Sequence, residues 1–528
     1  STLSPSSAAS DVYKRQPNTK QYALFNSLSD MMCDRESRLY DDENAWHSKF
    51  CMEVTSRVDE DIFKVLFTEG REDKKDGRPN AALRILIGMC ILKEGSGCSD
   101  EQLYEQCRYN LLYRRALGLI SLDEQCPSIN TYYTFRRRIC EYEETTGVNL
   151  FDLCFKQLTK AQLTEYRISG HTVRMDSKLI SSNIAWFSRY EIIHATLLKE
   201  ITKDEILQIE EQLIRQQTLE FFDEDAAKTV YQTDSESMNK RLTTLGIIIN
   251  YILEHTPTNN KPLLHRVFNE QYDKDENGIV TLRDKKLVSA KSLQNPNDPD
   301  AQYRGKGGKK IKGYSTNITE TTDEEDKPSL ITDVCVKGAG TADNSFLGDA
   351  VSNTEAVTGN KVKAVHADGA YQSEDNRKLA ADELRGFDFI ANGIQGKPSR
   401  FKLNLINDKT LEITDRLTDE VIIAIPTKQD KWKIPLQKDD DTTTWRYFDR
   451  NRIEKAKTRR EVESIPFEER KKRNNVEATI FQYCFHTRNN KTRYRGLIKH
   501  TLQALARCAW INVRRLFLFD LKLQLQRT

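Results

Sequence analysis

The segment KVKAVHADGAYQS, residues 361–373, constrains the fold of this 528-residue chain more than any other stretch. Residues 363–367 read as a short buried strand that runs into Asp368, and Gly369 then ends the strand before a helical run. Open α/β sheets place reactive groups here, at the carboxyl end of a strand just before a turn. For Asp368 alone, the alternative is a strand-ending residue that caps the next helix.

Two further segments carry acids in comparable surroundings. In HTVRMDSKLISSN, residues 171–183, Val173 and Met175 alternate with polar residues, and we expect Asp176 to end the alternation. Glu477 falls in an amphipathic helix, beside an apolar face formed at helical spacing by Val476, Ile480, Tyr483 and Cys484. Two strand-borne aspartates and one helix-borne glutamate can hold a pair of divalent metals, because hard oxygen ligands suit Mg²⁺ and Mn²⁺.

In these segments, and in others along the chain, the sequence resembles a bacterial insertion-sequence transposase of the DDE class, with an RNase H-like (retroviral-integrase-like) catalytic fold. The stretches that carry the resemblance are residues 77–119 and 127–139, the VRMDSK strand, the run DPDAQYRGKGGKKIKGY at 298–314, and ADGAY with the later Glu helix. Together they cover most of the chain from about residue 60 onward.

The resemblance implies an α/β fold, a mixed sheet flanked by helices in the order βββαβαβα. It places Asp176 on the first strand, Asp368 on the fourth and Glu477 on the last helix, as catalytic residues and as ligands of two Mg²⁺ or Mn²⁺ ions per active site. Two metals about 4 Å apart would activate a water or a 3′-hydroxyl and stabilise the leaving 3′-oxygen in an in-line displacement at phosphorus. No covalent protein–DNA intermediate is then needed.

A second feature of the Glu477 helix belongs to the same resemblance. Arg473 falls where related transposases have Arg in a Y-x-x-R-x-x-x-E-x(6)-K signature, so we expect it to support the site. The Tyr position of that signature is Arg470 here, and the Lys position is Cys484. Two of the four signature residues are therefore absent, which leaves a hairpin-handling role of this helix without support.

Length and periodicity suggest two to four domains. Residues 1–16 lack an initial Met and look like translated sequencing-adapter read-through, so we expect a non-native disordered tail; an ordinary Ser/Ala-rich tail is the alternative. Residues 17–165 read as a helical N-terminal DNA-binding domain. Residues 166–528 read as the catalytic domain, with a polar helical insertion over about 187–290 and a β-rich insertion over about 397–450.

Three basic regions predict contact with DNA. A Tyr-rich helix after Pro127 carries clustered arginines, and the run 298–314 reads as a flexible basic loop that clamps phosphates. Residues 451–528 hold 19 Lys/Arg against 7 Asp/Glu, a local charge of +12 in a chain whose net charge is +2. A solvated surface without DNA is the alternative. The candidate DNA-binding residues are Arg136, Arg137, Arg138, Arg304, Lys306, Lys309, Lys310, Lys312, Lys491, Arg493 and Arg495.

The expected function is a DNA transposase that cuts and joins insertion-sequence ends by metal-dependent phosphodiester hydrolysis and transesterification. The alternatives are a DDE-type DNA nuclease without strand transfer, and a catalytically dead, transposase-derived DNA-binding protein. The expected partners are double-stranded DNA, as terminal inverted repeats and as target, and a second protomer in the DNA complex, because two ends require two active sites.

Composition bears on where such a protein works. No apolar run approaches the roughly 18 residues of a membrane span, and no basic region followed by an apolar run marks a signal peptide. The eleven cysteines are scattered without a C-x-x-C pair, as expected for reduced thiols in a cytosol. We therefore expect a bacterial cytoplasmic protein without membrane contact, associated with the nucleoid when bound to DNA.

Overall fold

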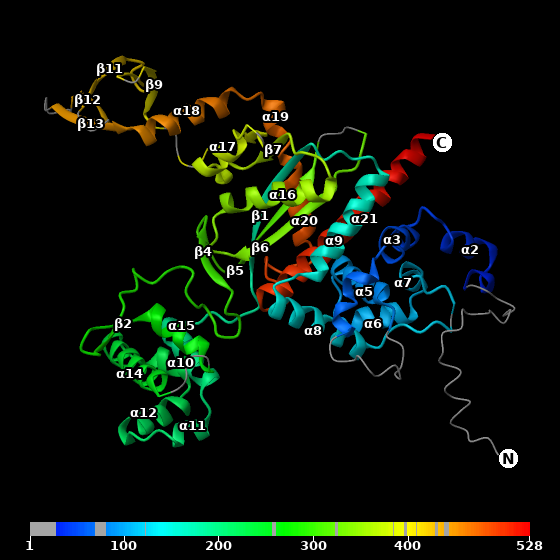
Figure 1. Cartoon of the computed structure of the whole chain (residues 1–528), viewed down its shortest axis with the longest axis horizontal. Coiled ribbons are helices and arrows are strands. Elements are labelled where there is room, and N and C mark those ends of the chain that lie inside the picture. Colours follow the sequence, from blue (N-terminus) through cyan, green and yellow to red (C-terminus); the bar gives the residue numbers. More distant parts are fainter. Residues whose placement is uncertain are drawn as a thin grey trace.

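The structure is a computed structural model with a central mixed sheet, N-terminal helices on one side of it and two insertions that project from it (Figure 1). The expected tail at residues 1–16 lies outside the described residues. The structure describes residues 28–68, 81–121, 123–255, 260–322, 326–383, 385–394, 396, 399–407, 409–427, 431–437 and 443–527.

The N-terminal region is helical. Ser99 caps one helix through a capping box and Ser128 caps another, because both hydroxyls accept backbone N–H groups of the first turn. The helices are α2 (Asp34–Tyr40), α3 (Trp46–Phe50), α4 (Val65–Thr68), α5 (Leu83–Ser96), α6 (Asp100–Tyr109), α7 (Leu111–Ala116), α8 (Ile129–Thr146) and α9 (Leu150–Glu165), with short turns η1 (Leu28–Met31), η2 (Cys51–Thr55) and η3 (Glu60–Phe63).

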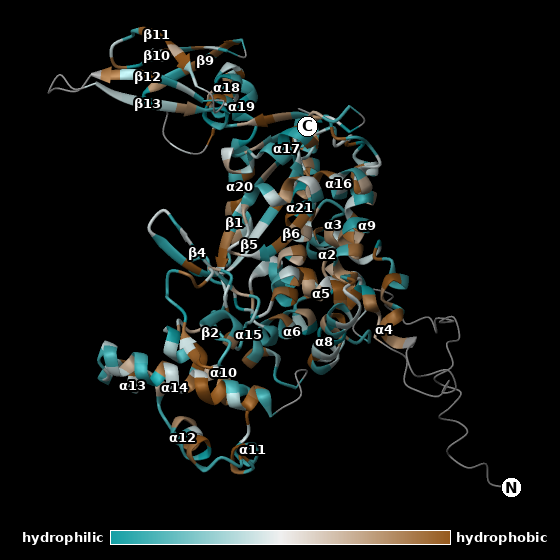
Figure 2. Cartoon of the chain, turned by 60° about the vertical axis from the view of Figure 1, so that its left-hand side comes forward, coloured by the Kyte–Doolittle hydropathy of each residue, from teal (hydrophilic) through white to brown (hydrophobic). Residues whose placement is uncertain are grey.

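These helices share one hydrophobic core with the sheet. Helix α5 is buried on nearly all sides, as its continuous apolar sequence predicts, and packs against the C-terminal helix α21 (Leu497–Arg527). The same buried cluster continues through α9 to residues of the central strands. In Figure 2 much of α5 accordingly carries the hydrophobic colouring.

The central sheet has the strand order β4-β5-β1-β7-β8, and β6 pairs with β5. Strand β1 is antiparallel to β5 and parallel to β7. The strands are β1 (Thr172–Ser181), β4 (Gln302–Lys306), β5 (Lys309–Thr321), β6 (Ile331–Gly338), β7 (Ala364–Ala367) and β8 (Asp388–Ala391). The helices around them are η5 (Asp343–Phe346), α16 (Leu347–Thr358), η6 (Gly369–Tyr371), α17 (Glu374–Ala380) and α20 (Asn474–Cys484).

Without its insertions and the extra hairpin strand β4, the catalytic region reads β1, β5, β6, α16, β7, α17, β8, α20. This is the order βββαβαβα, and the predicted fold class is confirmed. Val173 and Met175 are buried against α16, whereas Arg174 and Asp176 lie on the opposite face, beside α20. The apolar–polar alternation stops at Asp176, but β1 itself continues to Ser181 and pairs with β5 along its length.

A helical insertion follows β1 and has a hydrophobic cluster of its own. It contains α10 (Arg189–Glu200), α11 (Lys203–Leu207), α12 (Gln212–Phe222), α13 (Ala226–Gln232), α14 (Ser235–Glu254), α15 (Pro262–Gln271) and the hairpin β2 (Tyr272–Lys274) and β3 (Val280–Leu282). The chain returns from it directly into β4.

A β-rich insertion follows β8 as an antiparallel sheet of order β13-β12-β11-β10-β9. Helix α18 packs on this sheet and then leads through α19 to α20. The elements are β9 (Phe401–Asn407), β10 (Thr410–Asp415), β11 (Val421–Pro426), β12 (Lys431–Gln437), β13 (Thr443–Asp449), α18 (Arg450–Ser464) and α19 (Phe467–Lys471).

Candidate active site and DNA interface

Asp176 and Asp368 come from neighbouring parallel strands. The register of β1 and β7 pairs Arg174 with His366. This is the last pair of the ladder; Asp176 lies two residues further along β1, and Asp368 directly follows the end of β7. The charge of Asp368 acts on the Asp176 carboxylate, so the two acids are near each other. Adjacent strands lie about 4.8 Å apart, so the two aspartate side chains lie close together at this part of the sheet.

The turn after β7 fixes Asp368 in this place. Its carboxylate accepts the N–H of Gly369 at 2.6 Å and so caps η6; Asp368 thus has the capping role as well as a place beside Asp176. A side chain at Gly369 would put its Cβ 2.5 Å from the carbonyl oxygen of Gly393, so the close approach requires glycine. Tyr371 of the same turn is fully buried and donates its hydroxyl to Oδ1 of Asn317 on β5 at 2.6 Å.

The Asp176 carboxylate is largely withdrawn from water, with 17% of its side chain exposed. Its Oδ1 accepts the N–H of Ser177 at 2.9 Å. Burial raises the pKa of Asp176 above its usual range, and nearby Asp368 acts in the same direction, while the guanidinium of Arg473 and the Ser177 N–H oppose the rise. A buried acid beside a second acid is an arrangement in which a cation is favoured.

Arg473 joins two of the three predicted catalytic acids. It lies immediately before α20 and donates from Nη2 to Oδ2 of Asp176 at 2.9 Å and from Nη1 to Oε1 of Glu477 at 3.3 Å. Only 11% of the Arg473 side chain is exposed, against 64% of that of Glu477. The guanidinium therefore lies between the strand-borne and the helix-borne carboxylates.

The donor set suits a hard divalent cation in kind, because all three side chains offer carboxylate oxygens. In the described part of the chain, no group of three or more His, Cys, Asp or Glu residues is arranged to hold a metal ion. Asp176 and Asp368 adjoin, whereas Glu477 reaches Asp176 through the guanidinium of Arg473. The assignment of the three acids as metal ligands stays a prediction.

A buried ion-pair network that sequence reasoning missed holds α20 and α21 on the sheet. Glu320 of β5 is fully buried and accepts from Arg174 at 2.5 Å, from Arg515 of α21 at 2.7 Å and from the hydroxyl of Thr479 of α20 at 2.6 Å. Burial acts to raise the pKa of Glu320, but Arg515 and Arg174 outweigh it, so its pKa is lowered. The available signal was Arg174, an arginine two residues before Asp176 on the same strand face.

The expected flexible basic loop at 298–314 is instead a β-hairpin, so that expectation is wrong. Strands β4 and β5 pair from Gln302 to Lys306, and Gly307 and Gly308 form the two-residue turn with φ of 58° and 76°. Positive φ at both central residues is what tight hairpins of this kind require, and glycine supplies it. The cations therefore sit on an ordered ribbon.

The five predicted cations of this hairpin divide into two groups. Lys306, Lys309 and Lys310 are exposed near its tip, and Lys306 also lies 3.9 Å from the carboxylate of Asp343. Arg304 instead pairs with Asp343 at 3.0 Å. Lys312 is buried, donates to the carbonyl oxygen of Phe187 at 3.0 Å and has its pKa lowered by burial. Arg304 and Lys312 are thus engaged within the protein.

The predicted cations of α8 and of the segment before α21 meet at one hollow of ≈ 770 Å³, lined by residues that include Arg136, Arg137, Arg493 and Arg495. Arg136 pairs with Asp100 at 3.1 Å, and Arg493 donates to the carbonyl oxygens of Cys98 and Gly97. Arg493 therefore ties the C-terminal region to the N-terminal helices, whereas the Arg136 pair joins α8 to α6.

The remaining predicted cations are Arg137, Arg138, Lys491 and Arg495. Arg137 is 67% exposed and 3.6 Å from Glu141, and Arg495 is exposed and donates to the carbonyl oxygen of Asn183. Arg138 stacks over Phe67, and Lys491 is exposed. A role of these residues in DNA binding stays a prediction.

Comparison with protein families gives two matches on separate parts of the chain. The family described as Transposase domain (DUF772) matches residues 38–138, from within α2 to within α8. The family described as Transposase DDE domain matches residues 437–517, which include Arg473 and Glu477. Both matches support an insertion-sequence transposase of the DDE class.

The matched transposase families imply DNA binding, and the DDE domain implies a polynucleotidyl transferase or nuclease activity that uses divalent metal ions. Asp176 and Asp368 lie outside both matched ranges, so their place rests on the strand register. No curated protein and no solved structure matches the transposase. Among its described helices, none has the length and apolar character to cross a membrane.

Proposed function

We propose that this transposase cuts and joins insertion-sequence ends. It first hydrolyses a phosphodiester bond at each end; the freed 3′-hydroxyl then attacks a target phosphodiester, and the target 3′-oxygen leaves. The observation that carries the proposal is the Arg473 bridge from Asp176 to Glu477, supported by the parallel pairing of β1 with β7, the strand that Asp368 follows.

In this proposal Asp176, Asp368 and Glu477 hold two Mg²⁺ or Mn²⁺ ions. When bound, the ions activate the attacking oxygen and stabilise the leaving 3′-oxygen. Asp176 and Asp368 are held by the sheet and by the capped turn, and Glu477 is carried by α20, which the Glu320 network fixes to the sheet. Arg473 orients Asp176 and Glu477 and offsets part of their charge.

DNA is held, in the same proposal, by the exposed tip of the β4–β5 hairpin and by the solvent-facing cations around α8 and residues 491–495. Lys306 is the link between hairpin and acids, because its charge acts on the Asp176 carboxylate.

Two element ends need two active sites, so the working complex contains at least two protomers. A single protomer that joined both ends alone would contradict this. We place the activity in the bacterial cytoplasm, at the nucleoid.

The test begins with the DNA that flanks the gene. Inverted repeats found there provide duplex substrates, on which Mg²⁺-dependent strand cleavage and joining to a plasmid target are measured. Cleavage followed by joining supports the proposal. Cleavage without joining identifies a DDE-type nuclease, and binding without cleavage identifies a catalytically dead DNA-binding protein; either result overturns it.

A further inference from the structure

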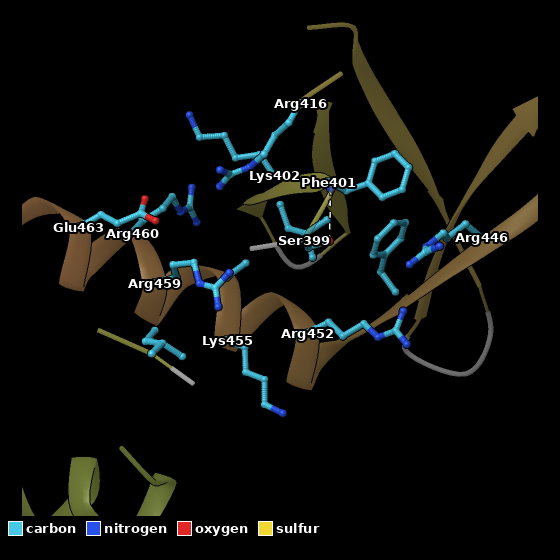
Figure 3. A pocket seen from close by; sticks show the side chains of 14 residues that line it. Ser399, Phe401, Lys402, Arg416, Arg446, Arg452, Lys455, Arg459, Arg460 and Glu463 are labelled. Atoms are coloured by element: carbon cyan, nitrogen blue, oxygen red, sulfur yellow. Dashed lines mark hydrogen bonds between the residues drawn. The ribbon is translucent and has the colours of Figure 1, made fainter. Parts of the chain in front are cut away.

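A second basic site lies in the β-rich insertion, away from the acids and the hairpin. Helix α18 and strands β9 and β13 enclose a hollow of ≈ 270 Å³. Figure 3 shows α18 along one side of it and the residues of the sheet across from the helix. Seven cations and one acid line the hollow, a local charge of +6; they are Lys402, Arg416, Arg446, Arg452, Lys455, Arg459, Arg460 and Glu463.

The positive charge of this hollow, called the α18 cleft below, is not neutralised by the protein. No described carboxylate forms an ion pair with any of the seven cations. Arg452, Arg459 and Arg460 donate only to neutral oxygens, those of Tyr447, Gly396 and Asn404. Lys402, Arg416 and Lys455 are exposed. Like charges this close together repel each other, and a bound anion would offset that repulsion.

The spacing of these cations fits an extended polyanion. Arg452, Lys455 and Arg459 follow one another at intervals of three and four residues, so they share one face of α18. At 1.5 Å per residue they span about 10 Å along the helix. Each DNA strand carries a phosphate about every 3.4 Å along the axis, so this row can meet more than one phosphate.

The walls of the α18 cleft offer phosphate contacts rather than base contacts. Its aromatic residues, Phe401 and Phe448, are 3% and 2% exposed and pack edge-to-face against each other, so their ring faces are not open to a base. Arg446 already lies over the Phe401 ring. Contacts to phosphate alone carry no sequence information. The cleft therefore suits DNA whose sequence varies.

We propose that the α18 cleft binds the phosphate backbone of DNA outside the terminal repeats, either the donor flank or the target. This inference rests on the proposed function, since both kinds of DNA change from one insertion to the next. The cleft is anchored to the catalytic sheet, because Arg377 of α17 donates to Thr458 of α18. Through α19, the same helix leads to α20 with Glu477.

The test compares the full-length wild type with the triple variant Lys402→Ala/Arg416→Ala/Lys455→Ala. The control triple, Lys409→Ala/Lys431→Ala/Lys457→Ala, removes three exposed cations of the same insertion that do not line the cleft. The probe is a short duplex without terminal repeats, titrated at several salt concentrations. The cleft variant should bind it more weakly, with a log–log salt slope shallower by up to about 2.7, whereas the control triple should change the slope less.

Substrate arms identify the source of the DNA. If the cleft variant is impaired only in binding repeat ends with long flanks, the cleft is assigned to the donor flank. If it is impaired only in joining ends to a plasmid, the cleft is assigned to the target. If the cleft variant keeps the wild-type affinity and salt slope with every substrate, the inference is overturned. It is also overturned if a polyglutamate peptide binds through the cleft as tightly as DNA does. Cleavage of repeat ends that lack flanks should persist in the variant, so failure here is distinct from failure of the proposed function.

Discussion

Arg473 donates from Nη2 to Oδ2 of Asp176 at 2.9 Å, across the junction between helix α20 and strand β1. The two residues are 297 positions apart in the sequence, so this bond joins the beginning and the end of the catalytic region. The second contact of the guanidinium, to Glu477, makes Arg473 a positioning residue for two acids at once. Its positive charge lies directly against both carboxylates.

Replacing Arg473 should therefore separate orientation from charge. We expect Arg473→Ala to lower the maximal cleavage rate by about 10²-fold, because a small displacement of catalytic groups is costly. The Mg²⁺ concentration for half-maximal rate should fall, because a competing positive charge is gone. Arg473→Lys should recover part of the rate. Cleavage kinetics over a Mg²⁺ series measure both quantities, and an unchanged half-saturating concentration would contradict the electrostatic part.

The three acids give the most direct prediction. Asp176→Asn, Asp368→Asn and Glu477→Gln should each abolish Mg²⁺-dependent strand cleavage. Each should leave binding to end DNA intact or slightly tighter, because one carboxylate less repels phosphate. Cleavage and gel-shift assays, run in parallel, measure both effects. Asp349→Asn is the control, because Asp349 of α16 is 64% exposed and pairs with Lys337 of β6. Near-normal cleavage by any of the three variants would contradict the assignment, and loss of binding together with cleavage would indicate a structural role.

The hairpin makes a prediction that separates exposed from buried cations. Lys309→Ala/Lys310→Ala should reduce the log–log salt slope of DNA binding by up to about 2, if both lysines meet phosphates. Lys312→Ala should leave the slope as in the wild type and instead lower stability, because it removes a buried contact to Phe187. Binding isotherms at several salt concentrations and thermal melts test both statements. An equal slope change for Lys312→Ala would mean that this lysine leaves its buried place to meet DNA.

Local patterns in the sequence predict the elements that carry the acids. Alternation around Val173 and Met175 marks β1, and the glycine after Asp368 marks the end of β7; both follow from side-chain periodicity and turn chemistry within a few residues. The helical spacing around Glu477 likewise predicts α20. What these patterns could not give is the parallel pairing of β1 with β7 that brings Asp176 near Asp368, because it is formed between segments about 190 residues apart.

Side-chain partners from distant segments show which of the predicted cations the protein itself engages. Lys312 is buried because the helical insertion brings Phe187 and Trp186 over it, and Arg136 is engaged because Asp100 lies on a neighbouring helix. Neither partner follows from charge counts or from spacing. A basic residue in a basic run is predicted to be exposed, and only the tertiary structure shows which of them the protein uses itself.

The Glu320 network should contribute strongly to stability. Glu320→Gln leaves Arg174 and Arg515 without their carboxylate in a buried place, and we expect a loss of about 3–5 kcal/mol in the free energy of unfolding. Because the folded pKa of Glu320 is lowered, its contribution is present above the unfolded pKa and is lost as pH falls through the folded value.

Urea unfolding measures the Glu320 effect, with Glu236→Gln as control. Glu236 forms a surface pair with Lys240 and is 81% exposed, so its loss should cost less than about 1 kcal/mol. Equal effects of the two substitutions would mean that the buried network contributes no more than a surface pair.

A last prediction concerns Asp333 of β6, which is fully buried and lies outside the candidate site. Burial, with nearby Asp152, raises its pKa to about 7, while Asn353, which donates to its Oδ1 at 2.8 Å, opposes the rise. Between the unfolded pKa of about 3.9 and this value, the folded state keeps a proton that the unfolded chain releases, so Asp333 should lower stability as pH rises, by up to about 1.4 kcal/mol per pH unit. Asp333→Asn keeps an acceptor for Asn353 and cannot ionise, so unfolding between pH 5 and about 7 should lose this slope. A pH profile unchanged from the wild type would show that Asp333 is ionised in the folded protein throughout this range.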